Sequence, residues 1–108
     1  ARKVAMILTK RRPVSVGDII KEEYLEPLQI TQEKLAKAMG VSRKTINEIC
    51  NGKRSITIDT ALLLAKVFEN TPDFWLNVQR RTELWTAMNT PERKAKIDRA
   101  TPVRNILT

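Results

Sequence analysis

Residues 42–48 form a short run of polar and basic side chains whose types match the hydrogen-bonding edges of DNA bases. Arginine and lysine donate to the N7 and O6 atoms of guanine, and asparagine pairs with the N7 and N6 atoms of adenine. Arg43, Lys44 and Asn47 therefore predict base recognition in a major groove. The predicted base-reading set is Ser42, Arg43, Lys44, Thr45, Asn47 and Glu48.

Three polar residues outside this run, one before it and two after it, are suited to contacts with the DNA backbone. Gln32 stands at the predicted start of the preceding helix, where its amide and the positive helix end favour a phosphate. Lys53 and Arg54 follow the run and predict phosphate contacts, which position a protein on DNA without specifying a sequence. The predicted phosphate-binding set is therefore Gln32, Lys53 and Arg54.

Each of these assignments has a plainer alternative that the sequence leaves open. Arg43 and Lys44 would also suit an ordinary solvated helix face, and Asn47 a neutral exposed position. Glu48 lies four residues after Lys44, so a surface ion pair is as good an interpretation as a base contact. Cys50 is interpreted as a small packing residue, because nothing beside it in the sequence indicates an activated thiolate.

The elements that must position these side chains are two short helices joined by a tight turn. Thr31 is a good N-cap for the first helix, and Gly40 ends it by adopting left-handed geometry at low cost. Ser42 caps the second helix at once, so the two helices cross steeply and need a small residue, Ala36, where their backbones approach. Together these features predict a helix-turn-helix. Its predicted apolar contacts are Leu35, Met39, Val41, Ile46 and Ile49.

Two of the three further predicted helices flank this pair. The first begins at Ser15, forms a capping box with Asp18, and ends before Pro27, which disfavours helical geometry at Glu26. The fourth helix in chain order begins at Thr57. Its predicted buried stripe is Ile58, Ala61, Leu62, Ala65 and Phe68.

The fifth helix is predicted from the Thr71–Pro72 start to Asn89. Phe74, Trp75 and Leu76 are consecutive apolar residues, so they cannot all face one core. Because aromatic residues are favoured at interface centres, this helix predicts a homodimer contact, with a tail folded back within one chain as the alternative. The predicted dimerisation residues are Phe74, Trp75, Val78 and Trp85.

The chain of 108 residues is predicted to be all-α, with one five-helix helix-turn-helix domain and short extensions at both ends. Residues 1–14 form the N-terminal extension, residues 15–89 the DNA-binding domain with its C-terminal dimerisation helix, and residues 90–108 a C-terminal tail. The Thr90–Pro91 pair is predicted to open one more short helix in that tail.

The net charge of +8 on so small a chain favours a polyanionic partner. The charge is concentrated in residues 31–56, which carry six basic and two acidic side chains. The absence of histidine excludes His-based acid/base catalysis and His metal ligation, so no metal and no cofactor are expected. Without histidine and without a carboxylate pair placed for acid/base work, the chain is expected to be non-enzymatic. The single cysteine and the lack of an apolar run of membrane-spanning length predict a cytoplasmic protein with no membrane partner.

Four stretches of the sequence resemble the lambda-repressor-type (XRE) helix-turn-helix family, and more closely its HigA/VapI-like antitoxins. They are Arg11–Pro13, Gly17–Pro27, Gly40–Arg54 and Thr71–Asn77. The last is the most specific, since plain repressors of this fold need not carry it. The resemblance implies a lambda-repressor-like fold and a bacterial antitoxin that represses its own toxin–antitoxin operon and neutralises a HigB-like ribonuclease toxin.

The toxin-binding surface is predicted on the N-terminal side of the chain. Ribonucleases of this kind carry basic surfaces for RNA, so an acidic helix face is an electrostatic match. The apolar segment Val4–Thr9, which could add as a strand to a partner sheet, and the basic run Lys10–Arg12 are further candidates. The alternative is that the acidic residues only solvate the helix. The predicted acidic contact set is Asp18, Glu22, Glu23 and Glu26.

One helix-turn-helix reads only a few base pairs, so a homodimer on palindromic double-stranded operator DNA is expected. The principal alternative function is a stand-alone XRE-type transcriptional regulator without a toxin partner. A repressor that senses a small molecule and a structural, nucleoid-type DNA binder are two further alternatives.

Overall fold

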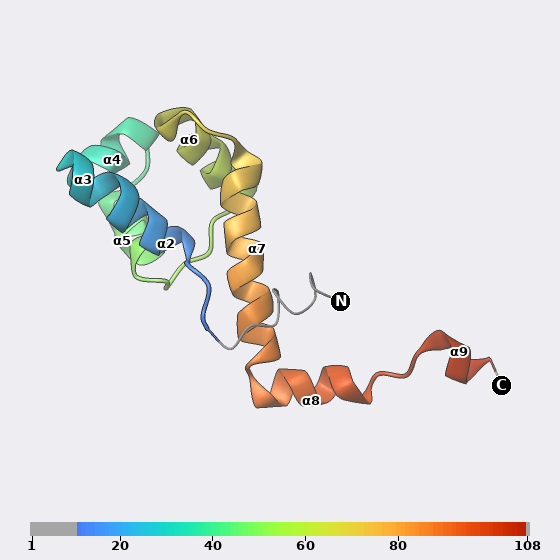
Figure 1. Ribbon diagram of the computed structural model, residues 1–108. Helices are drawn as coiled ribbons and strands as arrows, with labels where there is room; N and C mark the ends of the chain where they lie inside the picture. Colours follow the sequence, from blue (N-terminus) through green and yellow to red (C-terminus); the bar gives the residue numbers. More distant parts are fainter. Residues whose placement is uncertain (1–10, 108) are drawn as a thin grey trace.

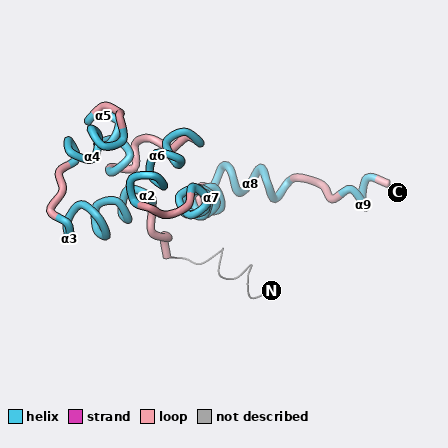
Figure 2. Tube along the Cα trace, turned by 90° about the horizontal axis from the view of Figure 1, so that it is seen from above, coloured by secondary structure: helices cyan, strands magenta, loops and turns pink. Residues whose placement is uncertain are grey.

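The computed structural model describes residues 11–107, and these residues contain helices and loops but no strand (Figures 1 and 2). The all-α prediction is therefore confirmed. A continuous first helix runs through three segments and is followed by six others. The elements are α2 (Val16–Ile19), η1 (Ile20–Leu25), α3 (Glu26–Leu28), α4 (Gln32–Met39), α5 (Arg43–Cys50), α6 (Ile58–Phe68), α7 (Pro72–Met88), α8 (Pro91–Arg99) and α9 (Val103–Ile106).

The first helix begins as the sequence predicts but ends later. The Ser15 hydroxyl accepts from the Asp18 backbone N–H, and the Asp18 carboxylate accepts from the Ser15 N–H, each at 3.1 Å, which completes the capping box. The helix does not stop before Pro27, because Glu26 keeps right-handed helical geometry. It ends instead at Gln29, which has a φ of 54°.

The π-helical geometry of η1 explains how the first helix accommodates Pro27. The Glu26 N–H donates to the Lys21 carbonyl, five residues back, so the turn that precedes the proline is wider than an α-helical turn. A wider turn keeps the pyrrolidine ring away from the carbonyl with which it would otherwise clash. Sequence periodicity does not reveal such a turn, so the predicted end was wrong.

The two helices of the predicted helix-turn-helix, α4 and α5, have the expected caps. Thr31 and Ser42 each accept a hydrogen bond from the backbone N–H three residues later, at 3.1 Å. Gly40 has a φ of 73°, and the Val41 N–H donates to the Ala36 carbonyl at 3.0 Å across the turn. The predicted apolar contacts are confirmed as buried or partly buried: Leu35, Ala36, Met39, Val41, Ile46 and Ile49.

Helix α6 begins after Thr57 as predicted, but its buried stripe was placed wrongly at two positions. Ile58 is 62% exposed and Leu62 is 52% exposed, whereas Leu64 is fully buried. The buried or partly buried face has the helical spacing of residues 61, 64, 65 and 68. Ile58 lies in the first turn of the helix, where it extends past the core, and Leu62 lies outside the buried face.

Helix α7 ends at its C-cap, Asn89, as predicted, and the chain then turns into α8. Every residue of α8 and α9 is exposed, and the two helices extend away from the body of the molecule (Figures 1 and 2). Helix α8 is the short helix predicted to follow Thr90, whereas α9 was not predicted from the sequence. Across the described residues, no helix is long and apolar enough to cross a bilayer. The segment Val4–Thr9 and Lys10 lie outside the described residues.

The hydrogen bonds of Gln79 and a cluster of aromatic rings fix α7 against the elements before it. Gln79 accepts from the Ile56 N–H at 2.6 Å and donates to the Ile56 carbonyl at 2.9 Å, which ties the loop after α5 to α7. The rings of Tyr24 and Phe68 stack with centroids 3.9 Å apart, and both lie near the fully buried Trp75. These contacts join η1, α6 and α7 in one core.

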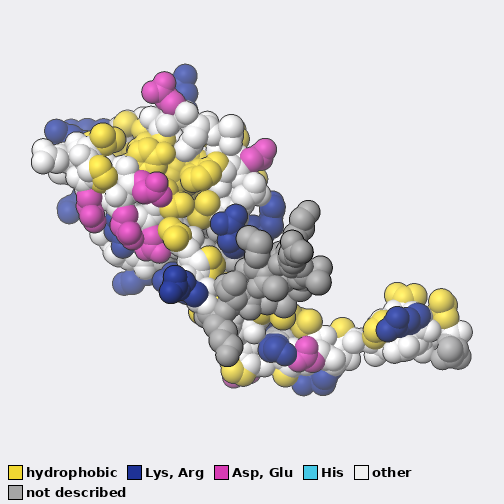
Figure 3. All heavy atoms as spheres, in the orientation of Figure 1, with side chains coloured by type: hydrophobic (Ala, Val, Ile, Leu, Met, Phe, Trp, Pro, Cys, Tyr) yellow, Lys and Arg dark blue, Asp and Glu magenta, His cyan; other side chains and the backbone are white. Residues whose placement is uncertain are grey.

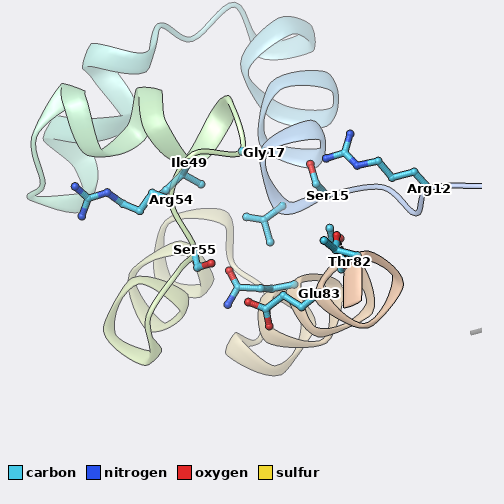
Figure 4. Close-up of a pocket in the computed structure, with 12 residues that line it drawn as sticks. Arg12, Ser15, Gly17, Ile49, Arg54, Ser55, Thr82 and Glu83 are labelled. Atoms are coloured by element: carbon cyan, nitrogen blue, oxygen red, sulfur yellow. Dashed lines mark hydrogen bonds between the residues drawn. The ribbon is translucent and has the colours of Figure 1, made fainter. Parts of the chain in front are cut away.

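Gly17 lies directly against the backbone at the C-terminal end of α5. A Cβ atom at position 17 would lie 2.5 Å from the Ile49 carbonyl oxygen and 2.6 Å from that of Cys50. Both neighbours are backbone atoms, so neither can move aside as a side chain would. Figure 4 shows Gly17 and Ile49 beside a small pocket of about 180 Å³ between α2, α5 and α7. Only glycine allows α2 to pack this closely on α5.

We expect Gly17→Ala to destabilise the chain by about 3 kcal/mol, because the methyl group forces apart two packed helix backbones. The matched control is Gly52→Ala. Gly52 has no atom near its missing Cβ, so its substitution carries only the cost of a φ of 71°, about 1 kcal/mol. Urea unfolding followed by circular dichroism measures both. Equal losses for the two variants would contradict the packing role of Gly17.

Candidate nucleic-acid interface

Helix α5 is held by one buried face and presents the opposite face to solvent. Ile46 and Ile49 are 0% and 2% exposed and anchor the helix in the core. Arg43, Lys44 and Asn47 are exposed, and together they line a shallow surface depression of about 370 Å³. The structure therefore brings together three of the six side chains for which base recognition was predicted.

Cys50 belongs to the buried face of α5, at 3% exposure. Burial raises the pKa of the Cys50 thiol, and the nearby charge of Lys21 opposes this only in part. The thiol therefore stays protonated at neutral pH and packs as a small apolar group.

Ser42 and Thr45 take part in the helix cap. The Ser42 hydroxyl accepts from the Thr45 backbone N–H at 3.1 Å, and the two side-chain hydroxyl oxygens are 2.9 Å apart. Their first role is to satisfy the start of α5, where backbone N–H groups lack helical partners. These hydrogen bonds hold the polar side chains at the start of α5.

Glu48 pairs with Arg54 rather than with Lys44. Two guanidinium nitrogens of Arg54, Nη2 and Nε, lie 2.7 and 2.9 Å from Glu48 Oε1. The ion pair that the sequence offered as one interpretation, with Lys44, is therefore replaced by one with Arg54, which was predicted to bind phosphate. Lys53 lies in the exposed loop, and its backbone N–H donates to the Glu48 carbonyl at 2.8 Å. This loop is folded back against the end of α5.

Gln32 also contacts α5 directly. The Asn47 amide Nδ2 donates to Gln32 Oε1 at 3.1 Å, and Asn47 Oδ1 accepts from Asn51 Nδ2 at 3.2 Å. Three amide side chains thus form a chain of hydrogen bonds across the two helices. No contact role was predicted for Asn51, although its position four residues after Asn47 indicates that the two share a helix face.

The predicted dimerisation residues divide into buried and exposed groups. Trp75 is fully buried and its indole N–H donates to Asn70 Oδ1 at 2.7 Å, while Val78 is 7% exposed. These two side chains belong to the core of a single chain, so assigning them to a contact with a partner was wrong. Phe74, at 39% exposure, and the partly exposed Trp85 lie at the surface of α7.

The four acidic residues predicted to contact a toxin lie along the first helix, where Figure 3 shows acidic side chains gathered on one face. Glu22, Glu23 and Glu26 are exposed. Asp18 is engaged in the capping box. Burial raises its pKa, but hydrogen bonds to Ser15 and nearby positive charges outweigh this and hold the pKa below its ordinary value.

Comparison with known proteins assigns the chain to a family. A family model described as "Helix-turn-helix" matches residues 20–75, which include the whole of α4 and α5. The chain is 49% identical over 88 residues to "Antitoxin HigA-1" of Vibrio cholerae, a match that covers 82% of this chain and 83% of that protein. The chain belongs to the HigA-like branch of the helix-turn-helix family. Proteins of this family are DNA-binding regulators rather than enzymes.

Two solved antitoxin structures have the same fold. "Pseudomonas aeruginosa antitoxin HigA with higBA promoter" matches with a TM-score of 0.76 and 32% identity, over 84% of this chain and 98% of that one. "Antitoxin GraA in complex with its operator" matches with a TM-score of 0.77 and 31% identity, over 87% of this chain and 94% of that one. Both relatives are bound to DNA in those structures.

We expect Glu48→Gln to strengthen binding to DNA of any sequence. The change removes a negative charge from the exposed face of α5 and frees the Arg54 guanidinium to contact a phosphate. Affinity for a random duplex should rise, and the slope of log affinity against log salt should steepen by about one phosphate contact. Fluorescence anisotropy at several salt concentrations measures both.

The matched control is Glu69→Gln, which removes the same charge at the end of α6, away from α5. It should change random-duplex binding less than Glu48→Gln does. If Glu48→Gln instead left random-duplex binding unchanged and altered the preference for one base, Glu48 would be a base-reading residue.

Proposed function

We propose that this chain is an antitoxin and a sequence-specific repressor of its own toxin–antitoxin operon in the bacterial cytoplasm. The observation that carries the proposal is the exposed face of α5, where Arg43, Lys44 and Asn47 lie around one depression while Ile46 and Ile49 hold the helix in the core. This arrangement suits insertion of α5 into a major groove. Relatives of similar fold bound to promoter or operator DNA support it.

The proposed DNA complex contains a homodimer on a palindromic operator. Two recognition helices one helical turn of DNA apart, or a multiple of that, would each read a half-site. The dimer contact is proposed on the exposed side of α7, where Phe74 and Leu84 are 39% and 43% exposed and Trp85 is partly exposed. Positions 74, 77, 81, 84 and 88 share one face at helical spacing, which would suit a second copy of the same helix.

A HigB-like ribonuclease is proposed as the protein partner. Support comes from membership of the HigA-like branch and from the exposed carboxylates of Glu22, Glu23 and Glu26, which would complement a basic RNA-binding surface. The alternative, a stand-alone regulator, shares the same DNA surface. A neighbouring reading frame whose ribonuclease product is inhibited by this chain separates the two functions.

We expect Arg43→Ala to cost about 1–3 kcal/mol in operator binding and to relax the preference at particular base pairs. Lys53→Ala should instead weaken all sequences alike and reduce the salt dependence, because a phosphate contact carries no sequence information. Titration of operator and random duplexes against each variant provides the comparison. Equal losses on both duplexes for Arg43→Ala would exclude base reading by that residue.

We expect Leu84→Arg to convert the dimer into a monomer, because it places a charge in the proposed apolar contact between two copies of α7. The matched control is Leu62→Arg, at a leucine that is similarly exposed but lies on α6. Size-exclusion chromatography with light scattering gives the mass of each. A dimer that survives Leu84→Arg, or is lost equally in the control, would place the interface elsewhere.

A further inference from the structure

Asn51 lies at the C-terminal end of the recognition helix, and the phosphate and base contacts proposed above do not use its side chain. Its Nδ2 atom donates to Asn47 Oδ1 at 3.2 Å. Asn47 in turn donates from Nδ2 to Gln32 Oε1 at 3.1 Å. Each polar atom of the Asn47 amide therefore has one partner inside the protein.

The hydrogen-bonding capacity of an asparagine amide shows what these contacts leave free. Its oxygen has two lone pairs and its nitrogen two hydrogens. With Asn51 and Gln32 each using one, Asn47 keeps one acceptor site and one donor hydrogen. Adenine requires one of each, a donor to N7 and an acceptor from N6. The two contacts thus leave the complement of an adenine edge unoccupied.

The two partners also couple the orientation of the Asn47 amide to their own. Rotation of the Asn47 amide by 180° would face its NH₂ group toward the Asn51 NH₂ group and its oxygen toward the Gln32 oxygen. Both contacts would then be repulsive unless the partners also rotated. The three amides are therefore ordered as one unit across α4 and α5.

We propose that Asn51 is a positioning residue that sets the donor and acceptor order of Asn47, and thereby its preference for adenine. This inference rests on the proposed function, since it concerns how α5 reads DNA. Asn51 acts through Asn47 and need not touch a base. Gln32 holds the other end of the same unit and keeps its own NH₂ group for a phosphate.

The helix cap itself does not need the Asn51 side chain. The C-cap hydrogen bonds from Asn51 to the Asn47 and Ile49 carbonyls are made by its backbone N–H. Its φ of −95° and ψ of 7° lie in a region open to other residues. Substitution of this exposed side chain should therefore leave folding intact while removing the contact to Asn47.

The test is selection of binding sites from a randomised duplex library by the parent chain, Asn47→Ala, Asn51→Ala and Asn51→Asp. Asn47→Ala should lose the preference for adenine at one position. Asn51→Ala should relax that same position, with about a threefold to tenfold loss of discrimination, the value of one neutral hydrogen bond. Asn51→Asp replaces the donor by an acceptor, favours the rotated amide, and should shift the preference away from adenine.

Glu69→Gln is the control, because it changes an exposed side chain at the end of α6, outside the proposed DNA contacts, and should keep the selected sequence. If the parent selects a sequence and both Asn51 variants select the same one, the positioning role is overturned while the proposed function stands. If Asn47→Ala keeps the adenine preference, the inference is likewise overturned. If the parent selects no sequence at all, both the inference and the proposed function fail. Thermal unfolding of each variant confirms that the chain remains folded.

Discussion

The contact between Gly17 and the last carbonyls of α5 is the constraint on which the placement of the recognition helix depends. With backbone oxygens of Ile49 and Cys50 against the missing Cβ, α2 and α5 pack at a distance that no other residue allows. The opposite end of α5 is fixed by the turn at Gly40 and the Ser42 cap. Held at both ends, the helix has little freedom to rotate, and its polar face is directed by packing rather than by the polar residues themselves.

The same packing explains why the DNA surface is already organised without DNA. The Ser42 and Thr45 hydroxyls are hydrogen-bonded to each other, and Asn47 is hydrogen-bonded to the amides of Gln32 and Asn51. Arg54 forms an ion pair with Glu48. Ordering long side chains costs conformational entropy, and groups ordered in the free protein do not incur that cost again on binding. The Glu48–Arg54 pair acts in the opposite direction, because DNA phosphates must compete with a carboxylate. This competition lowers the affinity for DNA of every sequence, because phosphate contacts carry no sequence information. Base contacts then provide a larger part of the total binding free energy.

Much of this fold could be predicted from the sequence because its signals are local. Caps at Ser15, Thr31, Ser42 and Thr57 and the turn at Gly40 each depend on residues within one helical turn, and the structure contains all of them. The errors arise where distant residues decide. The π-helical turn before Pro27, the burial of Leu64 in place of Leu62, and the burial of Trp75 within its own chain depend on how helices meet in space. Helical periodicity identifies an apolar face, but not the angle at which that face meets its neighbours.

The candidate site shows the same division more sharply. Residue types and the helix-turn-helix pattern predicted that Arg43, Lys44 and Asn47 face DNA, since base edges demand those donors and acceptors. The structure places all three on the exposed face of α5. The side-chain partners on this surface could not be predicted in the same way, because they are distant in sequence. Gln32 is 15 residues from Asn47, and Arg54 is six residues from Glu48. For Glu48 the sequence left two interpretations open, a base contact and a helical ion pair with Lys44 four residues earlier. The loop after α5 folds back instead and brings Arg54 to Glu48, since Gly52 takes a φ of 71° and Gln79 fixes Ile56 on α7. A loop held by a residue on a distant helix therefore determines the electrostatics of the recognition surface.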